Sequence, residues 1–337
     1  MFAQYEKYTL HFKQPSGTSR GILTTKETYF IKITHQHKTG IGECSIFRGL
    51  SYDDNPEYEQ KLQWLCQNIH QNLDILKDEL KNFPSILFGL EQALLNLYHG
   101  EDLYFPSLFT EGKSGIPING LIWMGSDDFM RKQIQDKINQ GFRCIKLKIG
   151  VNWQTEKKII QDLRNNFPKE ILELRVDANG AFNLSTAQKV LEDLARLDVH
   201  SIEQPIKTKN HKDMSILCSN TPISIALDEE LIGIISTVQK EEILEQIKPQ
   251  YIILKPSLIG GFSNCDEWIN LAEKSNIGWW ITSALESNIG LNAITQYTYT
   301  KQNPMPQGLG TGGLFTNNIP SDLVVIGEKL WKIKTNS

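Results

Sequence analysis

The sequence is poor in cysteine and has no paired cysteine motif. Its five cysteines are scattered along 337 residues, and no two of them form a Cys-x-x-Cys pair. An odd, dispersed set argues against a disulfide framework and against a structural zinc site. We therefore expect reduced thiols in a cytoplasmic protein; the five are Cys44, Cys66, Cys144, Cys218 and Cys265.

Long hydrophobic runs and a strong net charge are also absent. No uninterrupted apolar segment approaches the length that crosses a membrane. The first residues, MFAQYEKYTLHFKQ, carry charges where a signal peptide needs an apolar core. The formal net charge of −4 gives no broad attraction to nucleic acid. We expect a small-molecule partner, with no membrane and no nucleic acid, and the sequence leaves both a monomer and a homo-oligomer open.

The first part of the chain predicts a small α+β unit. The segments YEKYTLHF and ETYFIKITHQ alternate in the manner of strands, and GIGECS follows the second after HKTG, a hairpin-turn sequence. The stretches NPEYEQKLQWLCQNIHQNLDILKDEL and PSILFGLEQALLNLYHG have helical spacing, the second ending near Gly100. We assign residues 1–110 to this α+β domain.

Residues 111–315 predict an α/β domain of the (β/α)8 type, here a (β/α)7β barrel. The predicted strands are IPINGLIW, CIKLKIG, LELRVDA, SIEQP, ISIALDE, YIILKP and IGWWITS, with a poor eighth near QGLG. Helical stretches separate them, which implies parallel strands with right-handed crossovers. An open doubly wound sheet is the alternative. The barrel is favoured because polar residues recur at successive strand ends, which meet at one mouth only in a closed barrel. Residues 316–337 look like a strand pair that returns to the N-terminal domain.

The strand CIKLKIG carries two lysines, which is unusual for a buried strand. Side chains alternate along a strand, so Lys146 and Lys148 point to the same side. The following strands end with further ionisable residues: Asp177 in LRVDANG, Glu203 in SIEQP, and then Asp228 in IALDEE and Lys255 in ILKPSLIGG. Each lies about one βα unit after the previous one, so a barrel gathers them in one ring.

Three of these residues, Asp177, Glu203 and Asp228, form a potential site for a hard cation. Oxygen-only ligands favour Mg2+, with Mn2+ as a substitute, whereas zinc prefers His or Cys. None of the seven histidines falls at a strand end in this group. A cation held there would bind a substrate carboxylate and stabilise the charge that develops when the neighbouring carbon loses a proton.

The lysines fit the same chemistry. Lys148 and Lys255 would flank the cation from opposite sides, and a lysine near another positive charge is expected to have a lowered pKa and to act as a base. Lys146 would tune Lys148 and hold the carboxylate, although a structural ion pair explains Lys146 nearly as well. Each residue alone also has an ordinary structural explanation, such as a helix cap or a surface charge. Their occurrence at consecutive strand ends favours a catalytic site.

The ordered set IKLKIG, LRVDANGAF, IEQP, ALDEE and LKPSLIGG resembles the enolase superfamily, which uses Lys or His bases with magnesium. GECS and FGLEQAL resemble that superfamily's capping domain, which implies that residues 1–110 cap the barrel and that the C-terminal segment completes the cap. Three features resemble the o-succinylbenzoate synthase family: Arg175 two residues before Asp177, LKPSLIGG with a single lysine, and SALESNIGL.

This resemblance implies the syn dehydration of 2-succinyl-6-hydroxy-2,4-cyclohexadiene-1-carboxylate on the route to menaquinone. It implies that Lys148 is the base, that Lys255 stays charged and stabilises the enediolate, and that Asp177, Glu203 and Asp228 hold Mg2+. Further residues would contact substrate directly or through water. These are Lys146, Arg175, Asn179, Ser283, the main chain near Gly308 and, from the loop PSGTSRG expected to cover the site, Arg20.

Three alternatives remain at this stage. A dipeptide epimerase or N-succinylamino acid racemase would also use a lysine on each face of the substrate. Dipeptide epimerases usually carry a Lys-x-Lys motif at the sixth strand, where this chain has LKPS. A Schiff-base aldolase would use Lys255 as nucleophile and the glycine runs LIGG and GLGTGG to bind phosphate. A non-catalytic barrel that binds a small ligand is disfavoured by the intact Lys148 and carboxylate set.

Overall fold

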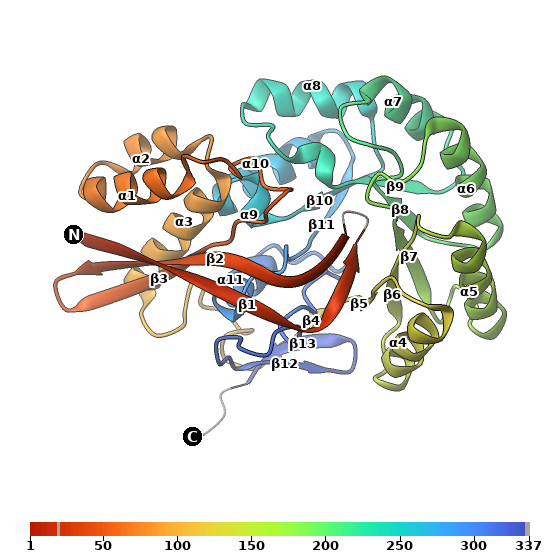
Figure 1. Ribbon diagram of the computed structural model, residues 1–337, viewed down its shortest axis with the longest axis horizontal. Coiled ribbons are helices and arrows are strands. Elements are labelled where there is room, and N and C mark those ends of the chain that lie inside the picture. Colours follow the sequence, from red (N-terminus) through yellow and green to blue (C-terminus); the bar gives the residue numbers. More distant parts are fainter. Residues whose placement is uncertain (19–20, 334–337) are drawn as a thin grey trace.

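The computed structural model describes residues 1–18 and 21–333. The chain begins with a long antiparallel β-ribbon (Figure 1). Strand β1 (Phe2–Thr18) pairs with β2 (Gly21–His35), and β2 pairs with β3 (Lys38–Cys44). One face of this sheet buries Tyr29, Ile31 and Ile33. Those side chains pack with residues of helices α1 (Tyr58–Asn68), α2 (Leu73–Leu80) and α3 (Pro84–His99). The predicted α+β arrangement of the first hundred residues is confirmed.

Two glycines of β3 allow the strand to lie directly on α3. A Cβ atom added to Gly40 would come within 2.0 Å of the Ala93 carbonyl oxygen, and one added to Gly42 within 2.0 Å of the Gly89 carbonyl oxygen. Any side chain at either position would push the helix away from the sheet. The glycines of GIGECS therefore serve packing inside the N-terminal unit.

The second part of the chain contains seven parallel strands in the order β11-β10-β9-β8-β7-β6-β5. Each falls within one of the seven predicted strand segments. They are β5 (Gly120–Ile122), β6 (Cys144–Lys148), β7 (Glu173–Asp177), β8 (Ser201–Glu203), β9 (Ser224–Leu227), β10 (Tyr251–Leu254) and β11 (Gly278–Ile281).

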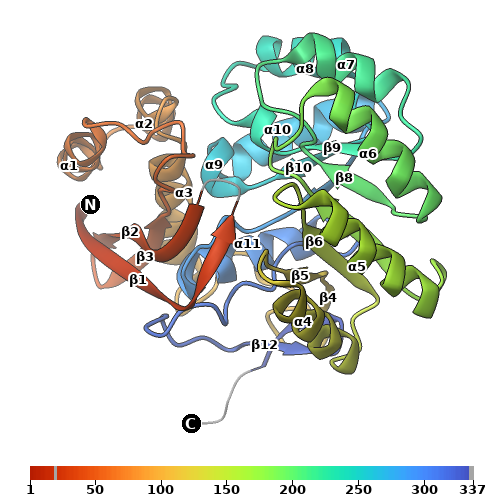
Figure 2. The ribbon, with the colours of Figure 1, turned by 45° about the vertical axis from the view of Figure 1, so that its right-hand side comes forward.

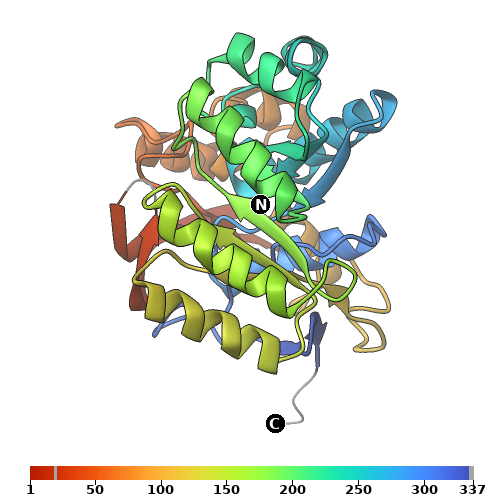
Figure 3. The same ribbon diagram turned by 90° about the vertical axis from the view of Figure 1, so that its right-hand side faces the viewer.

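Helices connect these strands and cover their outer face, as Figures 2 and 3 show for α4, α5 and α6. Their inward stripes of aliphatic side chains join the strands in one large core. The helices are α4 (Asp127–Asn139), α5 (Trp153–Asn166), α6 (Leu184–Arg196), α7 (His211–Ser219), α8 (Thr237–Ile247), α9 (Pro256–Ile259), α10 (Gly261–Lys274) and α11 (Asn288–Thr300), with a short 3-10 turn, η1 (Glu229–Leu231).

The weak eighth strand is reduced to two residues that link the sheet's two edges. Gln307 forms a parallel bridge with Ile118, and Gly308 forms one with Thr282. The backbone N–H of Gly308 donates to Ile281 O at 2.9 Å, and that of Asn119 donates to Gln307 O at 3.0 Å. This short connection brings the ends of the seven-stranded sheet around to each other.

The C-terminal strands occupy a different place from the one expected. Strands β12 (Leu323–Ile326) and β13 (Lys329–Lys332) form a hairpin that extends β4 (Ile116–Pro117). The same C-terminal segment contacts the N-terminal sheet through residues that precede the hairpin, where Thr316 N–H donates to His11 O at 2.9 Å and Asn317 Nδ2 donates to Thr9 O at 2.8 Å. None of the described helices combines the length and the apolar character needed to cross a membrane.

Candidate active site

The register of the parallel strands brings the polar strand ends to one level. Lys148 lies opposite Asp177 on the neighbouring strand, and Asp177 lies opposite Glu203 on the next. Asp228 follows β9 directly and Lys255 follows β10. All five predicted catalytic and metal-binding residues therefore stand at the carboxyl ends of consecutive strands. Their side chains form two groups of ion pairs, Lys148 with Asp177 and Lys255 with both Glu203 and Asp228.

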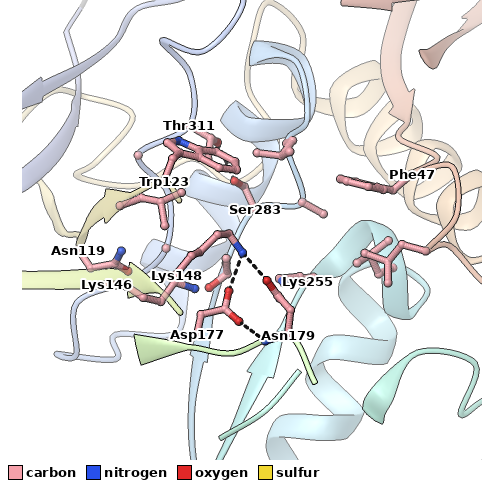
Figure 4. Close-up of a pocket in the computed structure, with 18 residues that line it drawn as sticks. Phe47, Asn119, Trp123, Lys146, Lys148, Asp177, Asn179, Lys255, Ser283 and Thr311 are labelled. Carbon is pink, nitrogen blue, oxygen red and sulfur yellow. Dashed lines mark hydrogen bonds and ion pairs between the residues drawn. The ribbon is translucent and has the colours of Figure 1, made fainter. Parts of the chain in front are cut away.

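A pocket opens over these strand ends, and Figure 4 shows the side chains that line it. Its polar floor includes Lys146, Lys148, Asp177, Asn179 and Lys255. Its walls combine apolar side chains from the N-terminal unit and from the barrel loops with a few hydroxyl groups. These wall residues are Phe47, Leu50, Asn119, Leu121, Trp123, Leu258, Thr282, Ser283, Ala284, Leu285, Gly308, Gly310 and Thr311.

Lys148 is held at the centre of the floor by two acceptors. Its ammonium donates to Asp177 Oδ2 at 2.8 Å and to Asn179 Oδ1 at 2.7 Å, as Figure 4 shows. The Trp123 ring centroid lies 6.0 Å from the same nitrogen. The side chain is 11% exposed, so the amine reaches the pocket while its stem is buried.

Asn179 adopts a backbone conformation that few residues accept, with φ of 43°. Asparagine tolerates this left-handed region better than most side chains. The turn lets the Asn179 N–H donate to Asp177 Oδ1 at 3.0 Å, while its side-chain amide donates to Glu229 Oε1 at 2.9 Å. The residue therefore orients both Asp177 and Lys148.

Two further lysines pair with the remaining carboxylates. Lys146 donates to Glu203 Oε2 at 2.7 Å, and both side chains are buried. Lys255 lies across the floor from Lys148, donates to Asp228 Oδ2 and stands 3.7 Å from Glu203 Oε1. The three ion pairs, Lys148–Asp177, Lys146–Glu203 and Lys255–Asp228, keep six charges compensated in a low-dielectric environment, where unpaired charges would be costly.

The carboxylates dominate the electrostatics of this floor. Burial disfavours the ammonium form of Lys255, but Asp228 and Glu203 outweigh burial and raise its pKa. The pKa of Lys146 is raised in the same way by Glu203 and Asp177. For Lys146 and Lys255 this is opposite to the lowering expected of neighbouring lysines, because the carboxylates beside them outweigh burial.

The acids themselves respond in different directions. Burial opposes ionisation of Asp177, yet the three lysines around it lower its pKa to about 2. Burial raises the pKa of Asp228; Lys255 opposes this effect, while Glu229 and Glu203 add to it.

The donor chemistry of the floor fits a divalent cation. Asp177, Glu203 and Asp228 offer only oxygen ligands, the set that Mg2+ prefers. Glu203 Oε1 is buried and has no hydrogen-bond partner. Within the described residues, no three acidic, histidine or cysteine side chains converge closely enough to enclose an ion. A cation at these oxygens would have to displace lysine contacts, so the ammonium groups and the cation compete for the same carboxylates.

The predicted substrate-binding residues are distributed unevenly. Ser283 and Gly308 line the pocket, and Ser283 Oγ lies 2.6 Å from Thr311 Oγ1. Arg175 does not line it, because its guanidinium lies deeper in the barrel, donating to Glu173 and to Pro306 O and stacking 4.5 Å from the Trp280 ring centroid. This placement does not support direct contact with substrate.

Arg20, the remaining predicted contact, lies outside the described residues.

The apolar wall of the pocket was missed by sequence reasoning. Phe47 and Leu50 come from the loop after β3, and a compact turn presents them, in which Phe47 N–H donates to Ser51 Oγ at 2.8 Å. Trp123 follows β5 and Leu285 follows β11. Nothing in their local pattern distinguishes such residues from core side chains; only the proximity of Phe47 to GECS could have indicated it.

Glu43 of GECS joins the N-terminal unit to the barrel. Its carboxylate accepts hydrogen bonds from Thr28 Oγ1 at 2.8 Å, from Ser287 N–H at 2.9 Å and from Gly290 N–H at 2.9 Å. The last two donors belong to the first turn of α11 and otherwise lack intrahelical partners. A buried carboxylate of the cap thus satisfies a barrel helix beside the pocket wall that Leu285 forms.

The glycine-rich turn LIGG does not present a free phosphate-binding helix end. Glu91 of α3 accepts hydrogen bonds from Phe262 N–H at 2.6 Å and from Ser263 N–H at 3.3 Å. The start of α10 is therefore already paired with a carboxylate of this chain, which would repel a phosphate. This arrangement weakens the aldolase alternative.

A parallel barrel with lysines and carboxylates at its mouth, beneath an α+β cap, defines an enzyme of the enolase superfamily. The family model described as "Enolase C-terminal domain-like" matches residues 129–319. The o-succinylbenzoate synthase of Desulfotalea psychrophila is 44% identical, with 98% of each chain covered. The chain therefore belongs to the o-succinylbenzoate synthase family of that superfamily.

Two solved structures extend the comparison. The crystal structure of MenC from Desulfotalea psychrophila has a TM-score of 0.88 and 40% identity, covering 98% of this chain and 99% of the other. The o-succinylbenzoate synthase of Thermosynechococcus elongatus, solved with magnesium in its active site, has a TM-score of 0.78 and 22% identity over 95% of this chain and 96% of the other. At that identity the second structure supports the fold alone.

Proposed function

We propose that this protein is a lyase that dehydrates 2-succinyl-6-hydroxy-2,4-cyclohexadiene-1-carboxylate to 2-succinylbenzoate in menaquinone biosynthesis. The observation that carries the proposal is the pair of lysines, Lys148 and Lys255, that line one pocket and pair with the carboxylates of Asp177 and Asp228, in a chain 44% identical to an o-succinylbenzoate synthase. The reaction removes one ring proton and one hydroxyl group as water. Aromatisation of the ring then favours the product, so the protein must mainly position a base and stabilise an anion.

Lys148 is proposed as the base. In its amine form, Nζ would take the proton from the ring carbon that bears the carboxylate, and as an ammonium it would return that proton to the departing hydroxyl group. Both events occur on one face of the ring, which agrees with a syn elimination. Asp177 and Asn179 hold Nζ at 2.8 Å and 2.7 Å, so its position is set before substrate binds.

Lys255 is proposed to remain charged on the opposite side. Although burial opposes its ammonium form, Asp228 and Glu203 raise its pKa, which suits a cation that stabilises the enediolate rather than a second base. Its pairing with Asp228 also disfavours Schiff-base chemistry, which needs a neutral amine.

Asp177, Glu203 and Asp228 are proposed to hold Mg2+, with Mn2+ as a substitute. Glu203 Oε1, which accepts no hydrogen bond, and the all-oxygen donor set support this assignment. When bound, the cation supplies Lewis-acid stabilisation for the substrate carboxylate and the negative charge that develops on it. Lys146, Asn179, Ser283 and the main chain at Gly308 are proposed to contact substrate, directly or through water.

The decisive experiment is turnover of the purified protein with the cyclohexadiene carboxylate and Mg2+, followed by the ultraviolet absorbance of the aromatic product. Lys148→Ala should lower kcat by at least about a thousandfold, with the fold retained by circular dichroism although Asp177 loses its partner. Lys158→Ala, an exposed lysine on α5, is the matched control and should behave as wild type. Near-normal turnover in Lys148→Ala would refute the proposed mechanism. Racemisation of N-succinylamino acids without dehydration would assign the site to the racemase instead.

A further inference from the structure

A polar groove continues from the catalytic pocket on the side of the loop after β8. Leu50 and Asn179 line both spaces, so the groove and the pocket are contiguous. On the barrel side the groove is bordered by Lys207 and Lys209, which follow IEQP in the chain. Both lysine residues are exposed.

The main chain fixes this loop against the catalytic floor. Gly180 has φ of 74°, and a Cβ atom added to it would lie 3.1 Å from Lys207 Cα. The Gly180 N–H donates to Gln204 O at 2.6 Å. The neighbouring Asn179 accepts the hydrogen bond from Lys148. Lys207 thus packs against Gly180, the residue next to the Asn179 that binds the proposed base Lys148.

The charges around the groove are unequal. Within the part of the chain that the structure describes, neither the Lys207 nor the Lys209 ammonium forms an ion pair. The nearby Glu230 carboxylate is already engaged, by Gln204 Nε2 at 2.9 Å and by His211 Nε2 at 3.1 Å. Glu229, the acidic residue that lines the groove, accepts a hydrogen bond from Asn179 at 2.9 Å. Both carboxylates are buried whereas both lysines are exposed, so the solvent-facing charge of the groove is positive in a chain whose net charge is −4.

We propose that Lys207 and Lys209 form a basic approach to the active site that attracts the dianionic substrate. This inference rests on the proposed function, since that substrate carries a ring carboxylate and a succinyl carboxylate. Exposed lysines act over about a Debye length, about 10 Å at 0.1 M salt, and a concave, low-dielectric border concentrates their field. They raise the rate of productive encounter and the affinity for the dianion without taking part in the chemical step.

The test compares Lys207→Gln/Lys209→Gln with Lys158→Gln/Lys189→Gln, which removes the same charge from exposed positions on α5 and α6. At about 20 mM NaCl, kcat/KM of the first variant should fall about three- to tenfold with kcat unchanged, and the deficit should vanish near 300 mM NaCl, where screening is strong. The control should match wild type at both salt concentrations. Loss of kcat, or a deficit independent of salt, would overturn the proposal, because a structural role of the loop is not screened.

Binding of the dicarboxylate 2-succinylbenzoate, measured by calorimetry, separates this inference from the proposed function. A wild-type protein that turns over the substrate, together with a Lys207→Gln/Lys209→Gln variant equal to the control, refutes the basic approach alone. A wild-type protein without turnover refutes the proposed function. In that case a salt-dependent loss of 2-succinylbenzoate binding in the variant still supports the basic approach, and unchanged binding refutes it as well.

Discussion

Asp53 is buried without full compensation in the loop that carries Leu50 into the pocket. Its Oδ2 accepts hydrogen bonds from Ser85 N–H at 2.9 Å and Ser85 Oγ at 2.7 Å, while Oδ1 is buried and has no partner. Burial raises the pKa of Asp53 to about 6, although the Ser85 donors at the start of α3 oppose the shift. We predict that ionisation of this one group weakens the anchoring of the loop.

The sign follows from the direction of the shift. A pKa above the unfolded value of about 3.9 means that the folded state binds the proton more tightly, so the stabilisation is complete below pH 4 and is lost as the pH rises through 6. Two pKa units correspond to about 3 kcal/mol of unfolding free energy. Asp53→Asn keeps an oxygen for Ser85 and cannot ionise. The free energy of unfolding of this variant minus that of wild type should therefore increase by about 2 kcal/mol between pH 4 and pH 7, since about half of the unfolded chains are already ionised at pH 4.

Urea unfolding at several pH values measures this difference, and Asp54→Asn is the adjacent control. Partial burial raises the pKa of Asp54, but hydrogen bonds from Gly49 N–H and Arg48 outweigh it and lower the pKa. The Asp54 contribution is present throughout pH 4–7 and is lost only as the pH falls below about 4. The difference between Asp54→Asn and wild type should therefore stay constant over the range in which the Asp53→Asn difference grows. A flat difference for Asp53→Asn across this range would refute the reasoning.

Three further predictions concern the site and its support. Asp177→Asn should weaken Mg2+ binding by about tenfold or more, since an anionic ligand becomes neutral, and an unchanged calorimetric titration would contradict that role. Lys255→Gln should lower kcat by about 10²-fold or more yet tighten Mg2+ binding, because a competing ammonium leaves the carboxylates; weaker Mg2+ binding would argue against the competition. Glu43→Gln should lower the free energy of unfolding by about 2–4 kcal/mol, because an amide has one acceptor oxygen and cannot accept all the hydrogen bonds that Thr28, Ser287 and Gly290 now donate. Urea unfolding curves that match wild type would exclude this role of Glu43 in joining the cap to the barrel.

The strands and their charged ends were predictable because side chains alternate with a period of two along a strand and because stretches with helical spacing separate successive strands. The depth of each side chain below the pocket was harder to predict. Arg175 and Asp177 do share a face, but residues two apart are separated by about 6.6 Å along the strand. That distance puts Arg175 one layer below the pocket, stacked on Trp280. Lys146, one layer below Lys148, still reaches Glu203 because its side chain is long and directed toward β8.

The loop contribution and the C-terminal strands could not be predicted for a different reason. Phe47 and Trp123 line the pocket only because loops from distant parts of the chain meet there, and their local sequences have no periodicity that specifies the meeting. The final hairpin alternates in a way that predicts its strands but contains no information on its partner. Its pairing with Ile116 and Pro117 instead of β1 depends on the whole barrel.

The contact of Glu43 with α11 limits how freely this cap can be exchanged. A foreign cap grafted onto the barrel to alter ligand preference would leave the buried Ser287 and Gly290 N–H groups with no acceptor, unless it placed a carboxylate at the same point. Recombination between relatives should therefore succeed only where the grafted piece carries the equivalent of GECS in register. Specificity can diversify in the loop tips, while the joint beneath them stays chemically fixed.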